Sequence, residues 1–313
     1  MARLVLGIAA SHSTLMNREP LPGEQPVPGS QEFKETLAAA RQMLVDARPD
    51  AVLVVGSNHF RGIYLDLMPQ FVLGVEECIG MGEAGTPSGP LTVHGELGHH
   101  VVSELVENEG FDVAFSQRLE ADHGITHALQ YLLPDRQTPI VPLIVNVFAP
   151  PMATVARSQA IGEAIRRAIE SMDSDLRVAV VASGGLSHQL PWPDWRTPQS
   201  DDDEFLVEAW LEGRKEWQTY TERRRSIISG GRAQINAEFD QELLADLVAG
   251  SVPKVTTKST LEILELAGNG GQEIRTWVIA AAVMNNTPAK VLFYQPIPEW
   301  LIGAGAVVFE PTA

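Results

Sequence analysis

The stretch VAVVASGGLSHQ, residues 178–189, contains the clearest single indication of the fold. It begins with five small or aliphatic residues that show no polar alternation, which is typical of a strand buried on both faces of a sheet. Gly184 and Gly185 follow, and glycine allows the chain to turn sharply. The turn ends at His188. We therefore expect a central strand over 178–182, with an imidazole placed just beyond its carboxyl end.

Runs of the same kind recur along the chain and predict five further strands. They are Leu4–Ala9, Ala51–Val55, Ile140–Val147, Lys290–Tyr294 and Ala306–Phe309. Between them, apolar residues recur at helical spacing, as at Phe33, Leu37, Ala40 and Leu44, and again at Ile161, Ile165 and Ile169. Strands alternating with helices predict an α/β fold with a central, mostly parallel or mixed sheet flanked by helices.

The pattern from about residue 201 to 284 is mostly helical, with apolar residues such as Leu206, Trp210, Leu243 and Leu247 at helical spacing. We interpret this region as a helical C-terminal flank, because two strand patterns follow it and return the chain to the sheet. The sequence therefore predicts one domain over residues 1–313.

Composition limits the classes of partner. The chain has 313 residues, with 23 Lys and Arg against 40 Asp and Glu, a formal net charge of −17. Such a charge repels phosphate backbones and anionic lipid headgroups, so we expect neither nucleic acid nor membrane partners. A single cysteine, Cys78, fits a reducing compartment. No apolar window approaches membrane-spanning length, and His12 interrupts the apolar start, so we expect a cytoplasmic protein.

Four of the eight histidines follow strand or turn patterns: His12, His59, His123 and His188. Ligands bind beyond the carboxyl ends of strands in α/β sheets, so side chains from different strands converge there. A lone histidine after a strand is usually structural, but four in such positions favour a shared site. His94, His99 and His100 lie in a helical pattern and are expected on a solvated face. His127 lies four residues after His123, a spacing that also suits two metal ligands.

Two histidines and one carboxylate form a common metal site that leaves positions open for substrate and oxygen on Fe(II). Spacing alone does not choose the carboxylate among so many acids. Glu238 and Glu273 are both candidates, and both also fit an acid in the first turn of a helix. Glu273 is favoured because glycines 268, 270 and 271 precede it and allow close backbone approach.

Six motifs, in this order, carry a family resemblance. They are IAASHS (8–13), SNHF (57–60), ADHG (121–124), SGGLSHQ (183–189), GNGGQEIRTW (268–277) and QPIPEW (295–300). Each motif alone is weak, but the ordered set resembles the class III extradiol ring-cleaving dioxygenases, the family of the protocatechuate 4,5-dioxygenase β chain. The resemblance extends from about residue 4 to residue 308.

The resemblance implies a role for each matching residue. His12, His59 and Glu273 match the family's Fe(II) ligands, whereas Glu238 falls at a position that the family does not keep acidic. His188 matches the acid/base histidine and His123 the second active-site histidine. Asp122 is expected to orient His123, its neighbour in the sequence. His127 has no counterpart.

The implied activity is Fe(II)-dependent cleavage of a catechol ring by O2, within a single catalytic domain. The expected substrate is a 3-substituted catechol such as 2,3-dihydroxyphenylpropionate, and the product is of the muconic semialdehyde type. A propionate side chain favours a cationic partner, for which Arg18, Arg61 and Arg275 lie near the motifs. We also expect a homo-oligomer. A zinc-dependent hydrolase and a non-catalytic binding protein remain alternatives, since the same ligand types also bind zinc.

Overall fold

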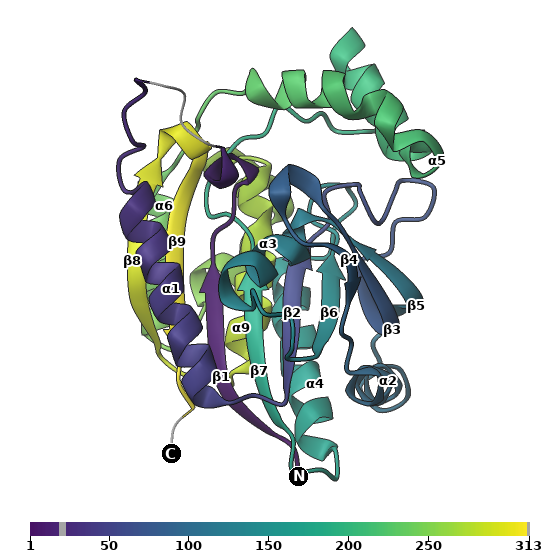
Figure 1. The fold of residues 1–313 in the computed structure, drawn as a ribbon, viewed down its shortest axis with the longest axis vertical. Helices are drawn as coiled ribbons and strands as arrows, with labels where there is room; N and C mark the ends of the chain where they lie inside the picture. Colours follow the sequence, from purple (N-terminus) through teal and green to yellow (C-terminus); the bar gives the residue numbers. More distant parts are fainter. Residues whose placement is uncertain (19–22, 312–313) are drawn as a thin grey trace.

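A computed structural model describes residues 1–18 and 23–311, and in these residues nine strands form one sheet (Figure 1). The strands are β1 (Arg3–Ala10), β2 (Ala51–Ser57), β3 (Phe71–Met81), β4 (Ser88–Leu91), β5 (Ala114–Ala121), β6 (Ile140–Val145), β7 (Arg177–Ser183), β8 (Ala289–Ile297) and β9 (Ile302–Phe309).

The strand order is β4-β3-β6-β2-β7-β1-β9-β8, and β5 pairs with β3. The four central strands, β6, β2, β7 and β1, are mutually parallel. In this register Val54 lies opposite Val181 on one side and Pro142 on the other. Antiparallel pairs, β3 with β6 and β1 with β9, extend the sheet in both directions. The carboxyl ends of the central strands therefore lie at one edge.

Helices cover both faces of the sheet. They are α1 (Ser30–Ala47), α2 (Gly95–Ser103), α3 (His123–Leu132), α4 (Val155–Ser171), α5 (Asp201–Ser229), α6 (Ala237–Val248), α7 (Pro253–Thr256), α8 (Thr260–Ala267) and α9 (Ile274–Val283). The pair α1 and α3 packs on one face, and the pair α4 and α9 packs on the other. In Figure 1, α5 lies above the upper ends of the strands.

The strand β2 shows why the central runs lack polar alternation. All seven of its residues are buried. Leu53 and Val55 belong to the apolar cluster under α4 and α9, whereas Val52 and Val54 belong to the cluster under α1 and α3. Successive side chains of a strand point to opposite faces, so both sets must be apolar when helices cover both faces.

The structure confirms the predicted α/β class, all six predicted strands and the helical C-terminal flank. The strands β3, β4 and β5 were not predicted from the sequence. β5 is half exposed and carries polar residues, and β3 contains Gly74, Gly80 and two adjacent glutamates. The apolar signal was therefore weak in β5, whereas β3 begins with a buried apolar run, Phe71–Val75, that the sequence analysis did not single out.

The helix α5 is bent at Glu216, whose backbone leaves the helical region (φ −139°, ψ 40°). Its first half packs into the core through Leu206 and Trp210, and the Trp210 ring stacks on Phe60 at 4.3 Å. The bend gives the second half a different direction from the first. None of the helices in the described ranges is long and apolar enough to cross a bilayer.

Candidate metal centre and active site

Four predicted site residues come together beyond the ends of three central strands. His12 follows β1, His59 follows β2, and His188 follows β7. Glu273 is the last residue of a short 3-10 helix, η4 (Gly270–Glu273), that precedes α9. Each side chain is at most 5% exposed, so their polar atoms interact mainly with one another. The parallel topology thus produces the predicted convergence.

The carboxylate of Glu273 lies at the centre of this group. Its Oε1 atom is 3.6 Å from Nε2 of His12 and 3.2 Å from Nε2 of His59. Bonds of ~2.1 Å from one metal ion to such ligands place neighbouring ligand atoms ~3–3.5 Å apart. Oε1 also accepts a hydrogen bond from the Ser57 hydroxyl, and Oε2 accepts one from the Gly185 amide at 2.6 Å. The donor types and the short distances from Glu273 Oε1 to the two Nε2 atoms therefore suit one divalent metal ion.

His59 is held at both ring nitrogens. Nδ1 lies 3.4 Å from Asp122 Oδ1, and Asp122 Oδ2 accepts the His59 backbone N–H at 2.6 Å. Burial opposes a charged imidazole, but the hydrogen bonds to Asp122 and Glu273 outweigh it and raise the pKa of His59 to about 9. Burial also opposes ionisation of Glu273, yet the surrounding histidines hold its pKa well below its usual range.

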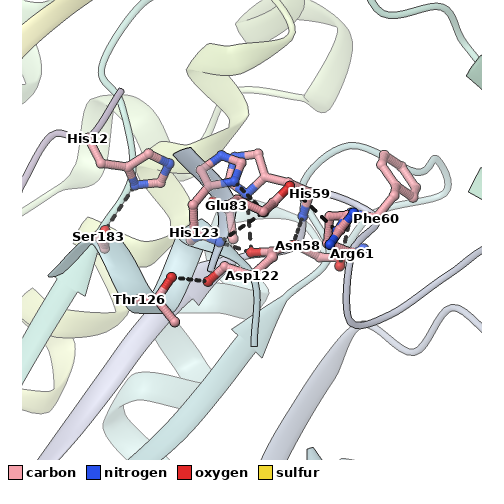
Figure 2. Close-up of polar contacts among 12 residues, drawn as sticks. His12, Asn58, His59, Phe60, Arg61, Glu83, Asp122, His123, Thr126 and Ser183 are labelled. Atoms are coloured by element: carbon pink, nitrogen blue, oxygen red, sulfur yellow. Dashed lines mark hydrogen bonds and ion pairs between the residues drawn. The ribbon is translucent and has the colours of Figure 1, made fainter. Parts of the chain in front are cut away.

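His12 and His188 differ from His59 because burial dominates their ionisation. Burial lowers the pKa of both imidazoles, so both are neutral near pH 7. His12 Nδ1 lies 2.9 Å from the Ser183 hydroxyl (Figure 2). His188 Nδ1 donates to the Leu186 carbonyl at 2.9 Å, which leaves the lone pair on Nε2. That Nε2 atom is 3.7 Å from Glu273 Oε2, beside the candidate metal position.

His123 has a different partner from the one predicted. Its Nδ1 lies 2.8 Å from Oε2 of Glu83, which also accepts the His123 backbone N–H at 3.2 Å (Figure 2). A carboxylate only accepts hydrogen bonds, so Nδ1 carries the proton. Asp122 bonds instead to His59 and caps the N-terminus of α3 through Gly124. The expectation that Asp122 orients His123 is corrected: Glu83 orients His123, and Asp122 orients His59.

The imidazoles offer a second set of possible ligands. Ligand atoms of His12, His59 and His123 all lie within 4.8 Å of one another, and the rings of His59 and His123 are 3.8 Å apart. His123 is thus close enough to act on anything bound at the metal position. The ring of His127 lies 5.6 Å from that of His12, and His127 does not line the cavity. Burial lowers the pKa of His127 to about 3. It is not in this cluster.

The glycines before Glu273 allow the loop after β7 to approach η4. A Cβ atom on Gly270 would lie 2.1 Å from the His188 ring, and one on Gly268 would lie 2.2 Å from the His188 carbonyl. Gly268 also has φ +78°, a conformation that favours glycine. Two of the three glycines that favoured Glu273 in the sequence, Gly268 and Gly270, therefore allow contacts with His188, whereas Gly271 lies against Ala267.

The four histidines His12, His59, His123 and His188 and the carboxylate of Glu273 form the floor of a cavity of about 640 Å³. Its upper wall comes from the second half of α5, including Trp217 and Arg224, and from Arg61 in the loop after β2. The volume lies within the range of small-molecule sites. The cavity thus holds buried titratable groups on one side and aromatic and cationic groups on the other.

Other candidates lie elsewhere. Glu238 is exposed in the first turn of α6, where an acid favours the helix dipole. Arg275 is fully buried and donates to the carbonyls of Ala153 and Gln272, so it does not line the cavity. Arg18 lines the cavity but pairs with Glu24 at the surface. Of the three histidines expected on a solvated face, His99 is exposed and pairs with a surface glutamate. His94 and His100 are half-buried instead, because His94 caps α2 and His100 contacts the Ala168 carbonyl.

Sequence reasoning did not find Glu83 or Arg224. Glu83 lies in MGEAG, where an acid between glycines after an apolar run was the only available signal. Arg224 lies in ERRRS, which reads as a solvated charge run, and nothing in that run distinguishes one arginine from the next.

The chain is similar to known proteins over most of its length. The family model described as the catalytic LigB subunit of aromatic ring-opening dioxygenase matches residues 6–305. The chain belongs to this family. Membership in the LigB family confirms the predicted resemblance and the class of enzyme, an aromatic ring-opening dioxygenase.

Several relatives are named 2,3-dihydroxyphenylpropionate/2,3-dihydroxicinnamic acid 1,2-dioxygenase, and two of them serve as examples. The protein from Rhodococcus jostii (strain RHA1) is 34% identical, over 94% of this chain and 95% of its own. The protein from Paraburkholderia xenovorans (strain LB400) is 33% identical, over 88% and 89%. A solved structure of an uncharacterized Escherichia coli K12 protein matches with a TM-score of 0.56 at 14% identity, covering 97% of this chain and 99% of that chain, and so shares the fold.

Proposed function

We propose that this LigB-family protein is an Fe(II)-dependent extradiol dioxygenase that opens the ring of a 3-substituted catechol with O2. The product is of the muconic semialdehyde type. One observation carries the proposal: Glu273 Oε1 lies within 3.6 Å of the Nε2 atoms of both His12 and His59, on the floor of a cavity that His188 and His123 also line.

His12, His59 and Glu273 would hold the iron through two imidazole nitrogens and one carboxylate oxygen. Bound there, Fe(II) supplies a redox-active centre through which a catechol and O2 exchange electrons. The protein prepares the ligands: Asp122 orients His59, Ser183 contacts His12, and Ser57 and Gly185 hold Glu273. Such outer contacts fix ring orientation and donor strength.

His188 is suited to take a proton from a catechol hydroxyl. Its pKa is lowered, its Nδ1 proton is committed to Leu186, and its basic Nε2 atom is beside the metal position. Once protonated, Nε2 of His188 can donate this proton to the oxygen atom that departs as the O–O bond breaks. Glu83 accepts the Nδ1 proton of His123. In the neutral ring the lone pair on Nε2 accepts a hydrogen bond from a substrate hydroxyl, whereas the imidazolium, paired with Glu83, donates from Nε2 to an oxygen atom of the substrate or of O2.

The substrate class follows from the relatives, which are named for 2,3-dihydroxyphenylpropionate, and from the cationic upper wall of the cavity. We include in the proposal that residues 1–313 act as one catalytic domain. The homo-oligomer, the cytoplasmic location and the lack of nucleic acid and membrane partners stay predictions.

The test is anaerobic loading with Fe(II), followed by oxygen uptake with a panel of catechols and absorbance spectra of the product. We expect oxygen consumption equimolar with the catechol and a yellow product. Protein loaded with Zn²⁺ is the control and should consume no oxygen. Bound iron without oxygen uptake on any catechol would overturn the proposal and favour a hydrolase or a binding protein.

Substitutions test the proposed roles of Glu273 as a metal ligand and of His188 in proton transfer. Glu273→Ala should lose iron and activity together, whereas His188→Ala should keep most of its iron and lose activity. Glu238→Ala is the matched control, because that acid is exposed outside the cavity, and it should behave as wild type. Normal turnover by His188→Ala at saturating catechol would contradict the proton-transfer role.

A further inference from the structure

Two arginines converge on the upper wall of the cavity. Arg61 lies two residues after His59, and Arg224 comes from the second half of α5. The guanidinium carbons lie 4.1 Å and 4.9 Å from the centre of the Trp217 ring, so one indole supports both cations. The Arg61 and Arg224 side chains are only 12% and 10% exposed. Water therefore solvates them poorly.

These cations have too few acceptors. Glu83 Oε1 is 3.7 Å from Arg61 Nε and 3.5 Å from Arg224 Nη1, both long contacts, and its other oxygen is committed to His123. Arg224 Nη2 donates to the His59 carbonyl at 3.2 Å. The Nε atoms of both arginines lack a hydrogen-bond partner among the described residues. Both Nε atoms are buried, but the Nη atoms of Arg61 also make no hydrogen bond within the described residues, and Arg61 lines the cavity. Acceptors on a ligand reach these Nη atoms and offset the cost of a poorly solvated guanidinium.

The charges indicate which acceptor fits. Two guanidinium groups face one carboxylate, Glu83, so these three groups together carry one uncompensated positive charge. The exposed Arg225 also lines the cavity, so this side of the cavity favours an anion. Guanidinium edges match the two oxygens of a carboxylate in a bidentate arrangement. Arg224 also contacts the backbone of His59, so the anion position is adjacent to the candidate metal ligands.

We propose that Arg61 and Arg224, supported by Trp217, form a carboxylate subsite that binds the acidic end of the substrate side chain. The catechol ring then lies between this subsite and the histidines. The inference rests on the proposed function for the identity of the ring, but binding of the carboxylate requires no metal and no turnover.

The first test measures binding to the metal-free protein. The probes are 3-phenylpropionate and its neutral analogue 3-phenylpropanamide, and the readouts are calorimetry and tryptophan fluorescence, since Trp217 lies at the subsite. Wild type should bind the acid at least about tenfold more tightly than the amide. Arg61→Met, which keeps an unbranched chain over Trp217, should remove this preference, and Arg61→Lys should restore only part of it.

Arg223→Met is the matched control. Arg223 precedes Arg224 on the same helix, but it pairs with Asp202 and does not line this cavity. Its substitution should leave the preference for the acid unchanged. An acid preference that survives in Arg61→Met would overturn the subsite, because the carboxylate would then be bound elsewhere, for example at a charged His59.

The second test uses the iron-loaded enzyme with 2,3-dihydroxyphenylpropionate and its methyl ester. Arg61→Met and Arg224→Met should each lower kcat/KM for the acid about tenfold or more, mainly through KM, and leave the ester nearly unaffected. Arg61→Met decides the test if loss of Arg224 prevents folding. Equal effects on acid and ester would overturn the inference. If wild type turns over neither compound, the proposed function fails. The binding test on the metal-free protein then still shows whether Arg61 and Arg224 bind a carboxylate.

Discussion

His59 combines a ligand nitrogen with a strong preference for its charged form. In the metal-free protein both ring nitrogens face carboxylates, and the pKa of His59 is raised to about 9. Metal binding requires the neutral ring, so a proton must leave when the ion enters. The high pKa thus makes metal affinity depend on pH across the neutral range.

We predict that Fe(II) affinity rises by about tenfold between pH 7 and pH 8, because each unit below the pKa of a competing proton costs about a factor of ten. Anaerobic, chelator-buffered titrations at the two pH values measure it. Asp122→Asn removes one carboxylate beside His59 and should flatten the dependence. An affinity that is equal at both pH values would show that His59 is already neutral in the metal-free protein.

The raised pKa of His59 also makes the folding stability of the metal-free protein depend on pH. Folding favours charged His59, so its contribution is fully present below pH 6.5, the ordinary pKa, and is lost as pH rises through about 9. This contribution applies to the metal-free protein, because the ion replaces the proton in the loaded protein.

Glu83 is the residue through which His123 is oriented. We predict that Glu83→Ala lowers kcat about 10- to 100-fold, the usual cost of losing an outer hydrogen-bond partner, because His123 then loses its fixed tautomer. Iron content should be unchanged, and Glu83→Gln should recover part of the rate through its amide oxygen. An uncharged 3-alkylcatechol is the substrate of choice, since it separates this effect from Arg61 and Arg224. A rise in KM alone would argue against the role.

At the scale of elements, η4 and the loop after β7 pack closely because Gly268 and Gly270 have no side chain next to His188. We predict that Gly270→Ala lowers activity by at least about tenfold while most iron is retained, because a Cβ atom would overlap the His188 ring and displace it. Gly230→Ala is the control, since its Cβ atom would meet no atom closer than 3.4 Å. Parallel loss of iron and activity would place the effect at Glu273 instead.

The bend in α5 determines which residues of this helix reach the cavity. The first half behaves as the apolar spacing predicts and packs Leu206 and Trp210 into the core. The second half is polar, and the bend at Glu216 separates its path from that of the first half. The region that the sequence predicted only as a helical flank therefore supplies Trp217 and Arg224 to the cavity wall.

At the scale of the molecule, strands from both ends of the chain are neighbours. β1 pairs with β7 on one side and with β9, the last strand of the described chain, on the other. The helix α9 packs against α4 and central strands, and its Trp277 is fully buried. Removing the C-terminal region would expose the core of the N-terminal region, so the two halves depend on each other.

We predict that unfolding follows a single transition, as expected for one cooperative domain. Thermal or denaturant unfolding of the metal-free protein, followed by far-UV circular dichroism and by tryptophan fluorescence, should give coincident curves. Two separated transitions, with residues 201–284 unfolding first, would contradict the single domain and indicate an independent helical unit.

The sequence by itself determined the α/β class, the central strands and the residues at the ends of β1, β2 and β7. It could do so because burial on both faces demands continuous apolar runs, and because parallel strands bring their carboxyl ends to one edge. The glycines before Glu273 indicated the carboxylate for a similar local reason. The family resemblance then gave these positions their expected roles.

Only the tertiary structure decided which side chains contact one another. Asp122 precedes His123 in the chain, yet it bonds to His59, because a helix cap points its carboxylate back toward the strand ends. Glu83 contacts His123, which lies forty positions later in the chain. Arg61 and Arg224 are much farther apart in sequence, yet both lie against Trp217. Local patterns report burial and turns, whereas contacts between distant polar residues depend on how strands pair and helices bend.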